Sequence, residues 1–223
     1  MLAAAGLTEQ ALRCPPDLPL SLSARADVLR AGGEPARVYM NCSGKHTAML
    51  STCVAAGWTT EDYMSVDHPL QKACRTTVEE LAGEDVPAIG VDGCGAPVMA
   101  LSLAGLARAF LAAVSAEEGT PPRRVADAMR AHPEYMSGSE RDDLRLMRAV
   151  PGLLSKGGAE GVLAVAVPGR GAVALKIDDG GERAALPVLV AALAHLGIHA
   201  DVAPEPVTGG GAPVGTVRPC YSL

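Results

Sequence analysis

The sequence predicts an α+β fold, in which helices pack on an antiparallel sheet. Apolar residues recur at helical spacing through the first two thirds of the chain. Two β-rich runs then follow, 162–167 and 172–177, and the turn residues 168–171 between them predict a hairpin. A final apolar helix is expected over 184–196. Strands and helices do not alternate regularly, which favours α+β over a repeated βαβ arrangement.

Composition excludes several classes of protein. The 223 residues are 48% hydrophobic and 20% charged, as in globular proteins, and aromatic residues make up only 3%, so Ala, Val and Leu must build the core. A formal net charge of -6 argues against a nucleic-acid partner. No apolar run approaches the ~20 residues of a membrane span, and no basic secretory leader is visible. Six irregularly spaced cysteines indicate reduced thiols and a cytoplasmic setting.

Proline and glycine divide the remaining elements. The proline-rich segment 14–19 ends the first helix, and glycines at 32, 57 and 83 end the next three. Segment 36–40 is expected to be extended, and 86–91 is predicted to form a strand. No helix or strand is predicted in the Pro- and Gly-rich tail that begins at residue 204. Besides the last helix, the predicted helices are 1–12, 23–31, 45–57, 67–83, 98–114, 120–132 and 140–150.

The stretch 41–46, Asn-Cys-Ser-Gly-Lys-His, concentrates titratable groups where a loop enters a helix. Unpaired N–H groups and the helix dipole create a positive electrostatic potential that favours an anion at the helix start. The same potential is expected to lower the pKa of the Cys42 thiol. Lys45 could pair with a carboxylate or act as a base, while His46 could belong to the site or to the core. The alternative interpretation is a capping Ser43, a buried Cys42 and a solvated Lys45.

The stretch 92–97, Asp-Gly-Cys-Gly-Ala-Pro, predicts a tight turn that brings backbone close to a ligand. Asp92 could bind a substrate amine or orient a lysine, or it could simply form an Asx turn. Lys176 stands in an apolar strand, either facing water at a sheet edge or supplying a cation to a nucleophile.

Together these motifs resemble the asparaginase II family. The match rests on 41–46, on 92–97, on Arg-Asp-Asp-Leu-Arg-Leu-Met at 141–147, on Gly-Ala-Glu-Gly-Val at 158–162, and on Pro-Gly-Arg-Gly followed by Lys176. These motifs occur in the family's order along nearly the whole chain. No single motif identifies the family, but the complete set is specific for it.

The resemblance implies an L-asparagine amidohydrolase with a fold similar to serine β-lactamases and penicillin-binding proteins. It implies catalytic roles for Lys176, which supports the nucleophile, and Lys45, and substrate binding by Asp92. We group Ser43, His46 and Cys94 with Asp92 as substrate-side residues. The family's zinc site implies Cys42 and Lys45 as ligands, and a homodimer is one possibility.

Two departures from the family pattern stand out. A further cysteine ligand is expected near Leu163 and Ala164, where neither residue binds metal. We therefore expect no required cofactor, and zinc at Cys42 and Lys45, with one family ligand missing, stays an alternative. The Ser-x-x-Lys motif of the family's N-terminal third has no counterpart, since no serine here stands three positions before a lysine. We thus expect 1–223 to be a single family domain that lacks its N-terminal part.

The leading hypothesis is therefore serine/lysine acyl-enzyme hydrolysis of L-asparagine, with the nucleophile outside this chain. One alternative makes Cys42 or Cys94 the nucleophile with His46 as its base. Another is a catalytically dead protein that binds a small amino acid.

Overall fold

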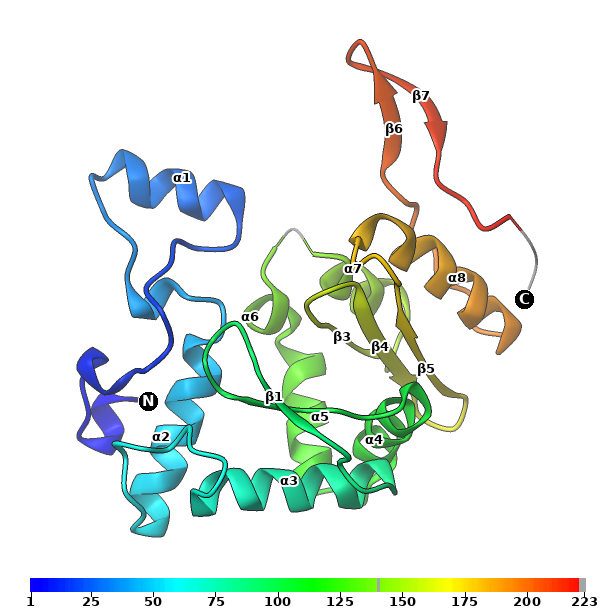
Figure 1. Cartoon of the computed structure of the whole chain (residues 1–223). Helices are drawn as coiled ribbons and strands as arrows, with labels where there is room; N and C mark the ends of the chain where they lie inside the picture. The colour runs from blue at the N-terminus through cyan, green and yellow to red at the C-terminus, as the bar shows by residue number, and fades with distance from the viewer. Residues whose placement is uncertain (140, 221–223) are drawn as a thin grey trace. The chain divides into compact units, whose positions relative to one another are not determined.

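The computed structural model describes residues 1–139 and 141–220, which form two compact units (Figure 1). The first unit contains Met1–Glu80 and Glu84–Ala100. The second contains Leu81–Gly83 and the described residues from Leu101 onward. Mixed helices and small antiparallel sheets agree with the predicted α+β class.

The first unit is built mainly from helices around a small core. Its sheet is a two-stranded antiparallel ribbon, and α2 buries Leu50 and Cys53 against the neighbouring loops. Gly57 ends α2 in the left-handed conformation, with φ +70°, as its position in the sequence predicted. The elements are α1 (Leu22–Arg30), α2 (Ser43–Ala56), α3 (Pro69–Ala82), β1 (Ile89–Val91) and β2 (Pro97–Met99).

Two expectations for the first unit are wrong. Residues 1–12 form two 3-10 turns, Ala3–Ala5 and Glu9–Ala11, and no α-helix. Gly6 adopts the left-handed backbone conformation, and the apolar run is too short to offset the free-energy cost of helix nucleation. Segment 36–40 contains another 3-10 turn, Arg37–Tyr39, in place of an extended run. The predicted strand is shorter than expected and begins at Ile89.

The second unit contains a three-stranded antiparallel sheet in the order β3-β4-β5. The predicted hairpin is confirmed, with Val165 opposite Val173 and Val162 opposite Lys176. The strands are β3 (Leu154–Gly157), β4 (Val162–Val167) and β5 (Gly171–Lys176), and the helices are α4 (Leu103–Ser115), α5 (Pro121–Ala131), α6 (Pro133–Ser137), α7 (Asp142–Ala149) and α8 (Ala185–His195).

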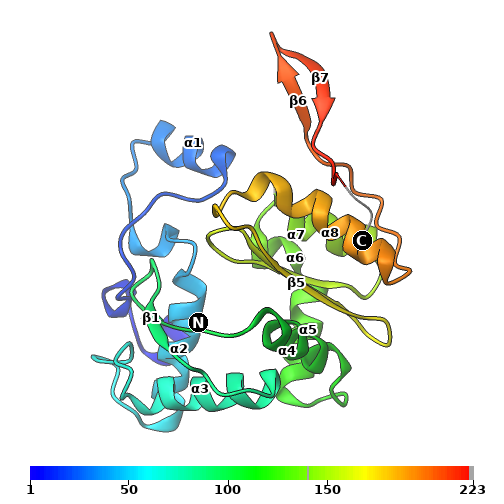
Figure 2. The same cartoon turned by 45° about the vertical axis from the view of Figure 1, so that its right-hand side comes forward.

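Helices cover both faces of this sheet (Figure 2). One core, centred on Val165 and Leu175, receives Leu189 and Leu193 from α8. The other joins Ala166 of β4 to Val114 of α4 and to α5. The valine and leucine side chains of the hairpin therefore pack in the core that contains α8, whereas its alanines pack in the core that contains α4 and α5.

The second unit also departs from the predicted boundaries. The helix expected from 98 starts at Leu103, because Pro97–Met99 pairs with β1 and the Ser102 hydroxyl caps the helix by accepting the Gly105 N–H at 2.9 Å. The helix expected from 140 starts at Asp142, and residue 140 itself lies outside the described part.

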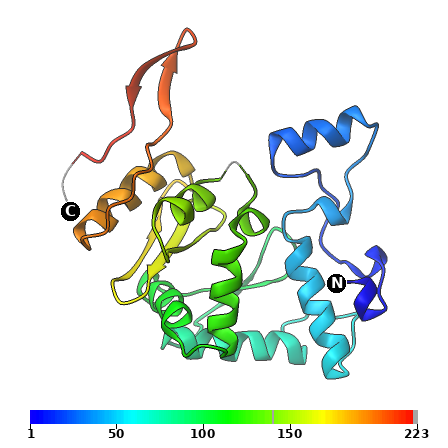
Figure 3. The same ribbon diagram turned by 180° about the vertical axis from the view of Figure 1, so that it is seen from behind.

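Four elements of the second unit are absent from the predictions: β3, α6, and the strands β6 (Pro206–Gly209) and β7 (Ala212–Thr216), which form a hairpin in the tail. This exposed hairpin extends away from α8 (Figure 3). None of the described helices combines the length and apolar content needed to cross a membrane.

Candidate functional site

The stretch 41–46 enters helix α2 as predicted. Cys42 is the N-cap residue, and its carbonyl accepts the N–H of His46 at 3.0 Å. Its side chain makes no capping hydrogen bond, and Ser43 is already the first helical residue, so the alternative of a capping Ser43 is wrong. The first-turn N–H groups of α2 create positive potential next to Cys42 and Lys45.

The stretch 92–97 forms the tight turn between β1 and β2. The Asp92 N–H donates to the Ala96 carbonyl at 2.9 Å, and the Gly95 N–H donates to the Asp92 carbonyl at 2.8 Å. Gly95 has φ +85°, which glycine adopts without strain. The Asp92 Oδ1 accepts the Gly93 N–H at 2.8 Å. The other carboxylate oxygen, Oδ2, can therefore accept hydrogen bonds from other groups.

These two stretches meet, although they are far apart in the sequence. Lys45 Nζ lies 3.0 Å from Asp92 Oδ2, and the Cys94 thiol donates to the same oxygen at 3.2 Å. The ligand atoms of Cys42, Asp92 and Cys94 all lie within 4.8 Å of one another. We call Cys42, Lys45, Asp92 and Cys94 the thiol–lysine cluster.

The charges in this cluster stabilise each other. Burial raises the pKa of Asp92, but hydrogen bonds from Lys45 and Cys94 and the lysine charge outweigh it, so the net shift is downward. Burial lowers the pKa of Lys45, and the Asp92 carboxylate reverses that effect, so the net shift is upward. At neutral pH the cluster therefore contains a carboxylate and an ammonium side by side.

The prediction for the Cys42 thiol is wrong in direction. We expected the helix terminus to lower its pKa, whereas burial raises the pKa more than nearby Lys45 lowers it. A protonated, half-buried thiol is a poor nucleophile without a bound metal or a base.

His46 belongs to the core of the first unit. Its side chain has no exposed area, its Nδ1 lies 2.6 Å from the Tyr63 hydroxyl, and its Nε2 has no hydrogen-bond partner among the described residues. Burial lowers the pKa of His46, so the ring is neutral at pH 7. The sequence did not indicate Tyr63, whose hydroxyl also accepts the Arg13 N–H at 3.1 Å.

The thiol–lysine cluster has the donor set of a zinc site. Two thiols and a carboxylate converge, and thiolates are the ligands that zinc prefers in tetrahedral sites. The second thiol comes from Cys94. The family pattern had instead placed a cysteine ligand near Leu163 and Ala164, which are buried in β4 of the other unit. The available signal was that each of the two stretches has a cysteine within two residues of a glycine.

Two other predicted residues, Ser43 and Lys176, are not members of the cluster. Ser43 is half-buried in the first turn of α2. Lys176 belongs to the second unit, where it ends β5, is exposed, and donates from Nζ to the Ile177 carbonyl at 2.5 Å.

The fold and cluster thus define an α+β protein with paired charges beside two thiols at a helix start. The sequence profile of the L-asparaginase II family matches residues 1–219, and the chain belongs to that family. No curated protein sequence matches the chain significantly.

Proposed function

We propose that the protein is an asparaginase that hydrolyses L-asparagine to L-aspartate and ammonia. Membership of the L-asparaginase II family supports this proposal. The observation that carries it at residue level is the 3.0 Å contact between Lys45 and Asp92, which joins two family motifs in one charged site.

The pair matches the two charges of an α-amino acid. The ionised Asp92 carboxylate suits the substrate ammonium, and the Lys45 ammonium suits the substrate carboxylate, so a bound substrate replaces one ion pair by two. The N–H groups at the start of α2 favour the negative charge that develops on an amide oxygen during attack.

The proposed chemistry is an acyl-enzyme route on a β-lactamase-like fold. A neighbouring base takes the proton of a serine hydroxyl, whose oxygen adds to the side-chain amide carbon. The carbon–nitrogen bond then breaks and ammonia leaves with that proton. Water hydrolyses the resulting ester to aspartate and the free serine. Lys176 supports the nucleophile in this proposal. The serine is not assigned to a residue of this chain.

Zinc is also part of the proposal. Cys42 and Cys94 would hold it as thiolates, with Asp92 or a deprotonated Lys45 as the further ligand, and binding would release protons. The residue that ligates zinc would then no longer offer its charge to the substrate. A bound zinc ion would supply positive charge that favours anionic groups in the site.

Binding of L-asparagine by calorimetry, together with ammonia release, tests the proposal. We expect Asp92→Asn and Lys45→Met each to weaken binding at least about tenfold, because each removes a charge-assisted hydrogen bond of ~1.5–3 kcal/mol. Asp67→Asn and Lys72→Met are matched controls: this exposed Lys–Asp pair, at 3.9 Å in the same unit, should leave binding unchanged.

The outcomes separate the alternatives. We expect little turnover from residues 1–223 alone, since they contain no Ser-x-x-Lys motif. Robust turnover that requires Cys42 or Cys94 would instead support a cysteine nucleophile. Binding without ammonia, even from a longer translated product, would favour a non-catalytic amino-acid-binding protein. Absence of both binding and turnover would overturn the proposal.

A further inference from the structure

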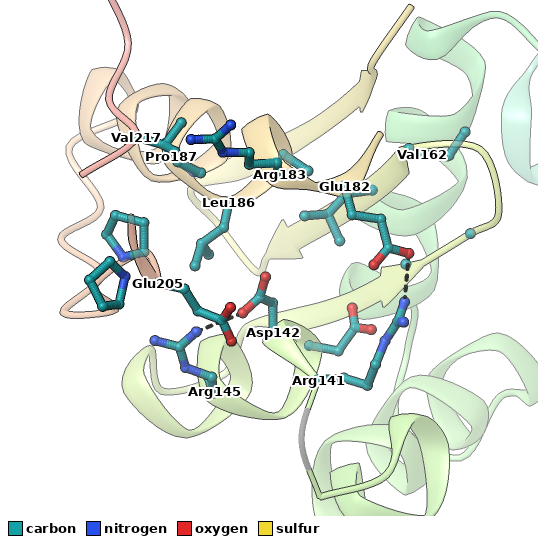
Figure 4. Close-up of a pocket in the computed structure, with 18 of the residues that line it drawn as sticks. Arg141, Asp142, Arg145, Val162, Glu182, Arg183, Leu186, Pro187, Glu205 and Val217 are labelled. Atoms are coloured by element: carbon teal, nitrogen blue, oxygen red, sulfur yellow. Dashed lines mark hydrogen bonds and ion pairs between the residues drawn. The ribbon is translucent and has the colours of Figure 1, made fainter. Parts of the chain in front are cut away.

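Reactive side chains gather in the first unit and not at the cavity of the second. That cavity, of about 640 Å³, is lined by charged groups that bond within the protein (Figure 4). Arg141 lies 3.2 Å from Glu182, and buried Asp143 accepts the Ser155 hydroxyl at 2.7 Å. No cysteine or histidine is among the described residues that line it. The thiols that lie close together belong to the thiol–lysine cluster.

The two thiols of this cluster are near enough to bond to each other. The Sγ atoms of Cys42 and Cys94 lie within 4.8 Å of each other, and both cysteines are free. A disulfide has a sulfur–sulfur distance of about 2.05 Å, so the two atoms need to approach by less than about 3 Å. Rotation of the cysteine side chains about χ1 moves the sulfur atoms while the backbone stays in place.

The two thiols differ in how easily a reagent reaches them. Cys42 is half-buried at the start of α2, whereas Cys94 is 1% exposed in the β1–β2 turn. An oxidant in solution therefore meets Cys42 first and finds Cys94 directly behind it. An accessible thiol with a second thiol beside it is the arrangement found at reversible oxidation sites.

We propose that Cys42 and Cys94 form a reversible disulfide with each other when a small-molecule disulfide, such as oxidised glutathione, meets the metal-free protein. The Cys42 sulfur attacks one sulfur of the oxidant, whose sulfur–sulfur bond breaks and releases one small thiol. The Cys94 sulfur then attacks the Cys42 sulfur and releases the second small thiol. Two protein thiols are thus oxidised, the oxidant is reduced to two thiols, and these take up the two protons that the protein loses.

The disulfide would change what the cluster offers to a ligand. It would remove both thiolates from a zinc site, and it would remove the Cys94 thiol that donates to Asp92 Oδ2. The inference rests on the positions of the two sulfur atoms, and it does not depend on asparagine hydrolysis. The competing explanation is that both thiols stay reduced and serve only as metal ligands.

Glutathione mixtures of increasing oxidised fraction test the proposal on the full chain after a chelator has removed metal. All proteins contain Cys220→Ser, because Cys220 is exposed and could link two molecules. Incubation to equilibrium compensates for the slow reaction of a protonated Cys42 thiol. The remaining thiols are alkylated, and trypsin then places Cys42 in the peptide 38–45 and Cys94 in the peptide 76–108. We expect mass spectrometry to find these two peptides joined, and to find them separate after treatment with dithiothreitol.

Three variants separate the steps. Cys94→Ser should stop the reaction at a mixed disulfide between Cys42 and glutathione, and Cys42→Ser should leave the buried Cys94 thiol unmodified. Cys74→Ser, at a half-buried cysteine in the same unit, is the matched control and should form the disulfide to the same extent as the parent. The joined peptides are identified in the parent, so the test still decides if Cys94→Ser unfolds.

Absence of the joined peptides from folded, metal-free parent protein in the most oxidising mixture overturns the proposal. A disulfide between another pair of cysteines, or a glutathione adduct on Cys42 that persists in the parent, also overturns it. A disulfide between Cys42 and Cys94 in a protein whose reduced form binds no L-asparagine supports this inference and counts against the asparaginase proposal. L-asparagine binding by a protein that forms no such disulfide does the reverse.

Discussion

Tyr63 connects the candidate site to the core of the first unit. Its side chain is fully buried, and its hydroxyl joins His46 Nδ1 at 2.6 Å and the Arg13 N–H at 3.1 Å. His46 directly follows Lys45, so this pair fixes the first turn of α2 on which the lysine stands.

Tyr63→Phe should lower the free energy of unfolding by about 1–3 kcal/mol, because it leaves buried groups without their partner. Urea titration followed by circular dichroism measures the change. Tyr39→Phe is the control, since Tyr39 is 39% exposed and should change stability by less than about 0.5 kcal/mol. Equal losses in both variants would contradict the role of the Tyr63 hydroxyl.

Glu79 gives a pH-dependent contribution to stability. The Val86 N–H donates to Glu79 Oε1 at 3.0 Å and Arg75 donates at 2.8 Å, and these contacts lower the pKa of the carboxyl. A carboxyl with a lowered folded-state pKa stabilises the protein above its unfolded pKa, and this stabilisation disappears as pH falls through the folded pKa.

Glu79→Gln should therefore be less stable than the parent at pH 7, and the difference should shrink between about pH 5 and pH 3. Urea unfolding at a series of pH values measures it, with neighbouring exposed Glu80→Gln as control. A difference that stays constant over this range would exclude the carboxylate as its cause.

At the scale of elements, α8 and the β4–β5 hairpin stabilise each other. Leu189 of α8 is fully buried in the core that contains Val165 and Leu175. The two β-rich runs of the hairpin and the apolar run of α8 were both visible in the sequence. The structure packs the hairpin and α8 in one core.

Leu189→Ala should cost about 2–5 kcal/mol, through lost apolar burial and a cavity in the core. Chemical denaturation measures the loss. Leu103→Ala, on the 45% exposed Leu103 of α4, should cost far less. A loss below about 1 kcal/mol at Leu189 would mean that α8 packs more loosely than described.

For the whole molecule, zinc is the ligand whose effect on stability is most direct. A ligand that binds only the folded state adds about 2.7 kcal/mol when present at 100 times its dissociation constant. Zinc should therefore raise the Tm, and a chelator should reverse the rise.

Cys42→Ser and Cys94→Ser should each abolish the zinc-dependent rise in Tm, which differential scanning fluorimetry measures. Cys74→Ser, at a half-buried cysteine in the same unit, should retain it. Unchanged zinc stabilisation in Cys42→Ser and Cys94→Ser would place the metal elsewhere.

Local patterns predicted much of the secondary structure. Glycine at position 57, proline at 121 and the turn at 168–171 act through backbone geometry close to themselves, so the bounds of α2, α5 and the hairpin followed from the sequence. The strands β2, β3, β6 and β7 were missed because strand pairing depends on partners elsewhere in the chain.

The sequence by itself determined the family motifs, the α+β class and the residue types of the candidate site. The tertiary structure decided which of those residues meet. Cys94 reaches Cys42, and Asp92 reaches Lys45, only because the β1–β2 turn lies against the start of α2. Burial then set the direction of the Cys42 pKa, and it left Asp143 beside a cavity. Contact between distant segments and exclusion of water are properties of the packed chain, and no local pattern encodes them.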